Sequence, residues 1–131
     1  MSRIRSKDTK PEIIVRRFLF SKGYRYRLHV GKLFGRPDIV LSKLKTVVFV
    51  HGCFWHGHQG CRYYVIPKTD TEKWTKKING NKQRDHENEK KLKADGWMVI
   101  SIYECDLKKN KIEKSFSKLE SRLRRRKKEY V

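Results

Sequence analysis

The segment 46–61 places a dense group of histidines and cysteines directly after an apolar run. It reads Thr-Val-Val-Phe-Val-His-Gly-Cys-Phe-Trp-His-Gly-His-Gln-Gly-Cys, and its first five residues are typical of a buried strand. The rest holds three of the five histidines and two of the three cysteines. Polar groups this dense beside a buried strand are costly unless they bind something. Two interpretations compete, a His-rich surface loop and a metal centre beside a catalytic strand end, and we favour the second.

The chain is strongly basic. Its 34 Lys and Arg against 14 Asp and Glu give a formal net charge of +20 over 131 residues. Because the basic residues are spread along the whole length, nucleic acid is a better expected partner than a membrane. The length predicts one domain over 1–131, with a basic arm over 1–10 and a basic helix over 107–131. No run approaches the roughly 18 apolar residues of a membrane span and no signal peptide opens the chain, so we expect a cytoplasmic protein.

Hydrophobic periodicity predicts an α/β chain with a mixed sheet flanked by helices. Helix signals begin at Pro11-Glu12, with Gly23 near the end, and again at Thr71-Glu72, with Asp95-Gly96 at the end. The expected strands cover 24–30, 36–41, 46–50 and 97–103.

Two pairings in this sheet bring distant residues together. If strands 36–41 and 46–50 form a hairpin, Asp38 lies opposite Phe49, so Asp38 and His51 share one end of the sheet. A strand, crossover helix and strand normally run parallel. Strand 97–103 therefore delivers Cys105 beside the loop after strand 46–50.

Cys53, His58, Cys61 and Cys105 supply three thiolates and an imidazole, a tetrahedral set suited to structural zinc. Clustered thiols in a cytoplasmic protein more often hold metal than form disulfides. With all four positions filled by protein, this zinc would not activate water.

Asp38, His51 and His56 then remain for chemistry. A carboxylate with a backbone carbonyl suits a hard cation such as Mg²⁺, which can bridge phosphate oxygens. A histidine can take the proton of an attacking water. The candidate reaction is phosphodiester hydrolysis.

Phe54 and Trp55 are two large aromatic residues inside a polar segment. They either fill a small core above the zinc or project outward as wedges that stack against bases. Trp74, at the head of the second helix, could join them in the second case.

The sequence resembles the very short patch repair endonuclease family over about residues 1–107. The resemblance is carried by Gly-Arg-Pro-Asp-Ile-Val at 35–40, Phe-Val-His-Gly-Cys-Phe-Trp-His at 49–56, Trp74, Asn81, Arg84-Asp85, Gly96-Trp97 and Glu104-Cys105. It implies a type II restriction endonuclease core in which the usual Glu-x-Lys pair is replaced by Phe-x-His, here Phe49 to His51. It also implies nicking of duplex DNA 5′ to the thymine of a T·G mismatch left by deamination of 5-methylcytosine.

Carried over by position, the resemblance implies Mg²⁺ on Asp38 and the carbonyl of Val50. It makes His56 the general base, oriented by Asp85, with His51 and Glu12 supporting the site. It assigns zinc to the same four residues, inserts Phe54, Trp55 and Trp74 beside the mismatch, and turns Lys77 and Asn81 toward the DNA. Two departures stand out: Val50 replaces a threonine of the best-known member, and the loop 56–61 has one extra residue.

We therefore predict a Mg²⁺-dependent DNA mismatch endonuclease with a structural zinc. We expect a monomer in the bacterial cytoplasm, associated with the nucleoid and linked in function to a cytosine-5 DNA methyltransferase and to repair proteins. The alternatives are a restriction-type or nicking nuclease for paired sites and a zinc-stabilised DNA-binding module without catalysis. Asp38, His51 and His56 favour either nuclease over the binding module, because a protein that only binds DNA does not require them.

Overall fold

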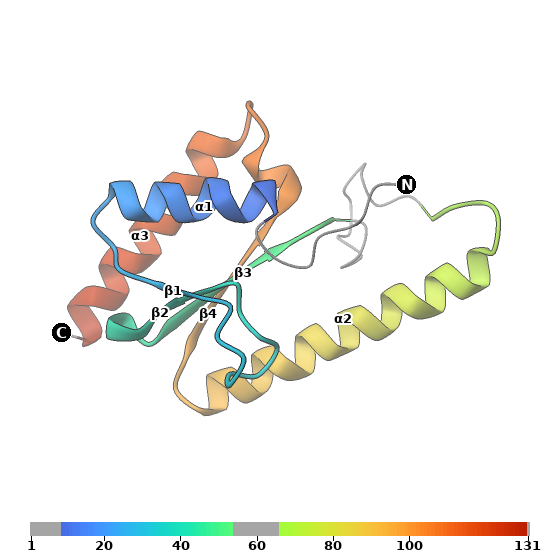
Figure 1. Ribbon diagram of the computed structural model, residues 1–131, viewed down its shortest axis with the longest axis horizontal. Coiled ribbons are helices and arrows are strands. Elements are labelled where there is room, and N and C mark those ends of the chain that lie inside the picture. Colours follow the sequence, from blue (N-terminus) through green and yellow to red (C-terminus); the bar gives the residue numbers. More distant parts are fainter. Residues whose placement is uncertain (1–8, 54–65, 131) are drawn as a thin grey trace.

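The computed structural model describes residues 9–53 and 66–130. A four-stranded sheet with the order β1-β2-β3-β4 lies at its centre, with α1 and α3 covering one face and α2 the other (Figure 1). The strands are β1 (Arg27–Leu28), β2 (Ile39–Leu41), β3 (Thr46–His51) and β4 (Met98–Tyr103). β1, β2 and β3 pair antiparallel, whereas β3 and β4 pair parallel. The predicted mixed sheet flanked by helices is confirmed.

Helix α1 (Lys10–Ser21) begins where the sequence signals predict. Thr9 is the N-cap, and its side-chain oxygen accepts a hydrogen bond from the backbone N–H of Glu12 at 3.4 Å. Glu12, Val15 and Leu19 are buried, and their spacing places them on one face of the helix. One position of an inward-facing row is therefore a carboxylic acid, an unusual residue for a core.

The β2–β3 hairpin has the predicted register. Ile39 pairs with Val48, and one further step sets Asp38 opposite Phe49. The turn is a 3₁₀ helix, η1 (Ser42–Leu44), followed by Lys45 in the left-handed region at φ 46°.

The first strand is shorter than predicted, because β1 covers Arg27–Leu28 and not the whole of 24–30. His29 has a φ of 50°, a left-handed conformation that an extended strand does not accommodate. The alternation of aromatic and basic residues before it nevertheless serves packing, since Tyr24 and Tyr26 lie against the core.

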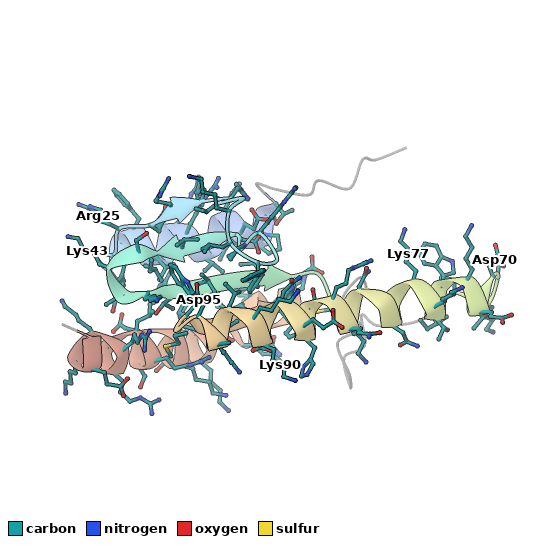
Figure 2. All side chains as sticks on the ribbon, turned by 90° about the horizontal axis from the view of Figure 1, so that it is seen from below. Arg25, Lys43, Asp70, Lys77, Lys90 and Asp95 are labelled. Carbon is teal, nitrogen blue, oxygen red and sulfur yellow. The ribbon has the colours of Figure 1, made fainter. Side chains whose placement is uncertain are left out.

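Helix α2 (Thr71–Ala94) connects β3 to the parallel strand β4, as predicted. It ends at Asp95, and Gly96 follows at φ 88°. Its first turns, from Asp70 past Lys77, extend beyond the sheet, whereas Asp95 lies beneath it (Figure 2). Leu92 packs with Val40, Val47 and Val99 on this face. The overhang projects past the C-terminal ends of β3 and β4.

Helix α3 (Ile112–Tyr130) begins five residues later than predicted, because 104–107 form a 3₁₀ helix, η2 (Glu104–Leu107). One side of α3 packs against the core: Leu119 and Leu123 are buried, and the ring of Phe116 stacks on Phe18 with centroids 4.0 Å apart. No helix in the described ranges is both long and apolar enough to cross a membrane.

Arg126, in the last turns of α3, joins this helix to the edges of the sheet. Its Nε donates to the carbonyl of Leu44 at 2.8 Å, and its Nη2 donates to the carbonyls of Gly96 at 3.0 Å and Lys45 at 3.3 Å. One side chain thus binds both the β2–β3 turn and the segment that leads into β4. We call this set of bonds the Arg126 clamp.

Candidate functional site

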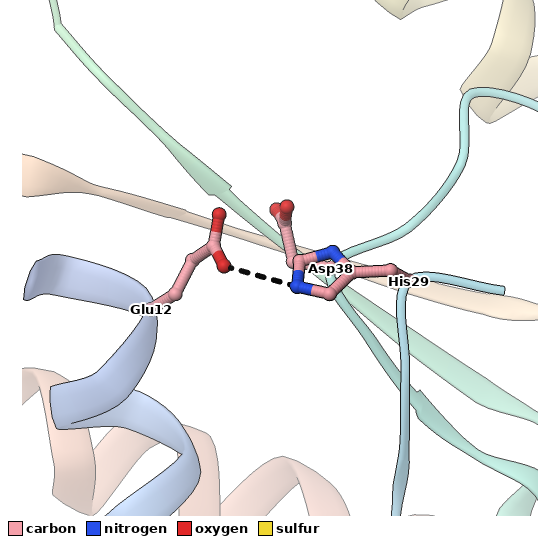
Figure 3. A group of neighbouring side chains, drawn as sticks. All are labelled: Glu12, His29 and Asp38. Carbon is pink, nitrogen blue, oxygen red and sulfur yellow. Dashed lines mark ion pairs between the residues drawn. The ribbon is translucent and has the colours of Figure 1, made fainter. Parts of the chain in front are cut away.

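Three side chains from separate segments converge at one end of the sheet: Glu12 from α1, His29 after β1 and Asp38 before β2 (Figure 3). One ligand atom from each lies within 4.8 Å of the others, and Nε2 of His29 is 3.5 Å from Oε2 of Glu12. Glu12 is buried, whereas His29 and Asp38 are partly buried. Two carboxylates and an imidazole are donors that can hold a divalent cation.

Backbone pairing brings His29 and Asp38 together. Leu28 pairs with Ile39, so the next step of the register sets His29 opposite Asp38, and the N–H of His29 donates to the carbonyl of Asp38 at 3.2 Å. Glu12 reaches the pair from the inner face of α1. The cluster is thus a consequence of strand register and helix docking together.

The carboxyl group of Asp38 has a strongly raised pKa. Burial raises the pKa of Asp38 to about 7, the charge of Glu12 and hydrogen bonding to it act in the same direction, and the hydrogen bond from the N–H of Val50 acts against them. Oδ2 of Asp38 accepts that bond at 2.7 Å. A hydrogen bond between two carboxyl groups needs a shared proton. A bound cation would supply the positive charge in place of that proton, so these residues fit a metal ion.

The backbone of Val50 faces the same side. The backbone carbonyl of Asp38 points toward β1, where it accepts the N–H of His29. In an antiparallel ladder the backbone groups of successive residues point to opposite sides, so those of the preceding residue, Pro37, point toward β3. The register sets Pro37 opposite Val50. Proline has no N–H to donate to the Val50 carbonyl. The Val50 N–H instead donates to the Asp38 side chain, which places the backbone of Val50 next to the acid pair.

His51 ends β3, but its ring is buried among aromatic side chains. Its centroid lies 5.7 Å from that of Phe49 and 5.3 Å from that of Tyr103, and the residue is only 7% exposed. Burial raises the pKa of Tyr103, and the negative charge of Asp85 adds to this effect. Asp85 on α2 therefore acts electrostatically on the end of the sheet that carries His51.

The predicted approach of Cys53 and Cys105 is confirmed. Both are buried, and the N–H of Cys105 donates to Sγ of Cys53 at 3.4 Å across 52 residues of sequence. Such bonds to sulfur are common around metal-bound thiolates. His58 and Cys61, the other two predicted ligands, lie outside the described residues, so the zinc site stays a prediction.

Phe54, Trp55 and His56 also lie outside the described residues. Among the predicted DNA-facing residues of α2, Lys77 is exposed, while Trp74 and Asn81 are partly buried. Their spacing places all three on one side of α2, and Lys77 lies in the part that extends beyond the sheet (Figure 2). Arg84 donates a hydrogen bond to Oδ1 of Asn81, which orients that amide.

His29 is the site residue that sequence reasoning missed. The sequence places it in the expected strand 24–30, where a histidine needs no special role. The signal was available, because a hairpin between strands 24–30 and 36–41 brings the residues beside its connecting loop, His29 among them, close to Asp38.

The chain matches the family model described as DNA mismatch endonuclease Vsr over residues 1–62. The type II nicking enzyme V.NmeAIP of Neisseria meningitidis serogroup A is 53% identical over 86% of this chain and 79% of its own length. V.XorIIP of Xanthomonas oryzae pv. oryzae, also named a type II nicking enzyme, is 47% identical over 95% of this chain and 86% of its own length. The DNA mismatch endonuclease Vsr of Escherichia coli K12 is 38% identical over 82% of this chain and 69% of its own length. With relatives this similar over most of both sequences, and with an acid pair at the end of its central sheet, the chain belongs to the Vsr family of DNA mismatch endonucleases.

Proposed function

We propose that this protein nicks one strand of duplex DNA 5′ to the thymine of a T·G mismatch left by 5-methylcytosine deamination, and so starts very short patch repair. The E. coli relative is named for mismatch cleavage, and a formal net charge of +20 suits a DNA substrate. The observation that carries the proposal is the Glu12, His29 and Asp38 cluster beside the backbone of Val50. A DNA-binding module without catalysis has no need of two carboxylates this close together at the end of its sheet.

Asp38 and the carbonyl of Val50 would hold Mg²⁺ at the sheet end. When bound, the cation would polarise the scissile phosphate and stabilise charge on the leaving oxygen. The Val50 N–H fixes the Asp38 carboxylate in place, so this group is preorganised. Glu12 adds a second negative charge that strengthens the attraction for a cation.

Proton transfer would fall to histidine. His56 would take the proton of the attacking water, with Asp85 orienting its ring. His51, buried at the end of β3, would support this arrangement through its fixed ring position.

The remaining parts of the proposal concern structure and context. We propose that the sheet is a restriction-endonuclease-like core, that a zinc ion on Cys53, His58, Cys61 and Cys105 ties two strand ends together, and that Phe54, Trp55 and Trp74 insert at the mismatch. The protein would act as a monomer at the bacterial nucleoid, functionally linked to a cytosine-5 DNA methyltransferase and repair proteins.

A second candidate is nicking at fully paired sites. It is favoured by the names of the Neisseria and Xanthomonas relatives, both type II nicking enzymes. Its chemistry is the same, so only the substrate separates the two candidates.

One assay tests both. End-labelled duplexes that are paired, T·G mismatched or U·G mismatched are incubated with the protein in Mg²⁺, in Mn²⁺ and in chelator. We expect a nick 5′ to the mismatched thymine that requires a cation; equal cleavage of the paired duplex would select the second candidate, and the absence of any nick would reject both.

Asp38→Asn is the active-site variant for this assay. We expect it to abolish nicking and to change DNA affinity by less than about tenfold, because phosphate contacts supply most of that affinity. The matched control is Asp95→Asn, an exposed residue at the C-terminal end of α2, at the other end of the sheet. Nicking by Asp38→Asn at the rate of this control would move the active site elsewhere.

A further inference from the structure

We propose that His29 is a nitrogen ligand in the cation site formed with Glu12 and Asp38, and that it makes this site prefer Mn²⁺ over Mg²⁺. The inference rests on the proposed function, which places a catalytic cation at Asp38. It adds a ligand outside the set implied by resemblance and a preference for one class of metal.

The geometry suits shared coordination. Two ligand atoms at about 2.1 Å from one cation, separated by about 90–110°, lie about 3.0–3.4 Å from each other. Nε2 of His29 and Oε2 of Glu12 are 3.5 Å apart, and the Asp38 oxygen completes a set within 4.8 Å. Shifts of less than about an ångström would bring all three atoms onto one ion.

The site is also sheltered enough to favour ligands over water. The side chain of Glu12 is 4% exposed and that of His29 is 25% exposed. The two side chains point toward each other and toward Asp38, from opposite sides of the carboxylate (Figure 3).

His29 is held in position by its backbone. Its N–H is bonded to the Asp38 carbonyl, and its φ of 50° turns the chain out of β1 at this residue. The backbone that carries the imidazole therefore does not depend on a metal ion for its location. A preorganised ligand loses less entropy on binding.

The donor set decides the metal preference. Mg²⁺ strongly favours oxygen ligands in octahedral geometry, whereas imidazole nitrogen suits first-row transition metals. Mn²⁺ accepts both donor types and carboxylates suit it well. A mixed set of two carboxylates and one imidazole should therefore hold Mn²⁺ more tightly than Mg²⁺.

The competing interpretation is a simple ion pair between protonated His29 and Glu12. That pair would help to neutralise a buried carboxylate but would repel a cation. The two interpretations predict opposite changes when the imidazole is replaced: loss of a ligand weakens Mn²⁺ binding, whereas loss of a positive charge strengthens the binding of any divalent cation.

The test is a titration of the protein with Mn²⁺, in which electron paramagnetic resonance measures the concentration of free Mn²⁺. A second titration adds Mg²⁺ as a competitor for the same site. We expect His29→Gln to weaken Mn²⁺ binding by at least about tenfold, because loss of even an outer-shell partner of a metal ligand costs about 10–100-fold in metal affinity. The affinity for the competitor Mg²⁺ should change by less than about threefold. Glu12→Gln should weaken both metals. His86→Gln removes an exposed histidine from α2 and should behave as wild type.

Nicking assays separate failure of this inference from failure of the proposed function. We expect the ratio of nicking rates in Mn²⁺ and Mg²⁺, measured at subsaturating metal, to fall about tenfold in His29→Gln. If the wild type nicks DNA and His29→Gln binds Mn²⁺ as tightly as the wild type or more tightly, the inference is overturned and the proposed function stands. Mn²⁺ binding that depends on His29 in a protein that nicks no duplex would retain the ligand set and reject the proposed function.

Discussion

The Arg126 clamp should be a main source of stability for the β2–β3 turn, and Arg126→Ala tests this. The guanidinium group donates to three backbone carbonyls in two chain segments. Hydrogen bonds from charged groups contribute about 1.5–3 kcal/mol each, so three of them set an upper bound of about 9 kcal/mol.

The expected loss is smaller, because two of the three carbonyls keep another donor. The carbonyl of Leu44 also accepts from Oγ1 of Thr46 at 3.0 Å, and that of Lys45 accepts from the N–H of Met98 at 3.0 Å. The bond to Gly96 is exposed, so water replaces it. We therefore expect Arg126→Ala to lower the free energy of unfolding by about 2 kcal/mol, which is about 8 °C in Tm for a chain of this size.

Thermal and urea unfolding of two matched variants measure this effect. Arg125→Ala removes the same charge from the neighbouring exposed position and should change stability by less than about 0.5 kcal/mol. Arg126→Lys keeps the charge but lacks the planar fork, so it should recover less than half of the loss. Equal stability of Arg126→Ala and Arg125→Ala would refute the reasoning.

Three further predictions concern the candidate site. Burial and Glu12 raise the pKa of Asp38 to about 7, above its usual value near 4, so between these pH values the folded state binds a proton that the unfolded state has lost. The Tm of the metal-free protein should therefore fall from pH 5 to pH 7.5. Asp38→Asn should flatten this dependence. Cys105→Ser should reduce bound zinc and lower stability, since it unties β4 from the loop after β3; metal analysis of the purified wild type without zinc would contradict this. Trp55→Ala should leave Tm nearly unchanged and lower discrimination between T·G and paired duplexes about ten- to a hundredfold, whereas a core residue would cost about 3–5 kcal/mol of stability with discrimination intact.

The parts of the fold that follow from local patterns could be predicted from the sequence. Alternation and a short polar turn set the β2–β3 register, which places Asp38 opposite Phe49. The strand, helix, strand order gives the parallel pairing, and this brings Cys105 to Cys53. In both cases a rule about neighbouring segments is enough.

The rest depends on tertiary packing that no local pattern encodes. The β1–β2 register brings His29 to Asp38, but His29 meets Glu12 only because α1 docks across the sheet end, and the extent of β1 is set by one residue at positive φ. Arg126 is one of many basic residues in the last helix, and its role follows only from the position of the β2–β3 turn beneath it. A basic residue in a basic helix gives no signal of such a contact.

The parallel pairing of β3 with β4 affects the order in which the protein can fold during synthesis. The acid cluster comes from the first 53 residues, but β3 lacks its second neighbour until Met98–Tyr103 has left the ribosome. At about 5–20 residues per second, this interval lasts several seconds. During that time the edge of β3 lacks its native partner, and Val47 and Val48 lack much of their final cover. A chain that stops within α2 therefore leaves one edge of β3 without its native partner and cannot complete the sheet. We expect such an interrupted translation product to be a substrate for proteolysis and to lack nuclease activity.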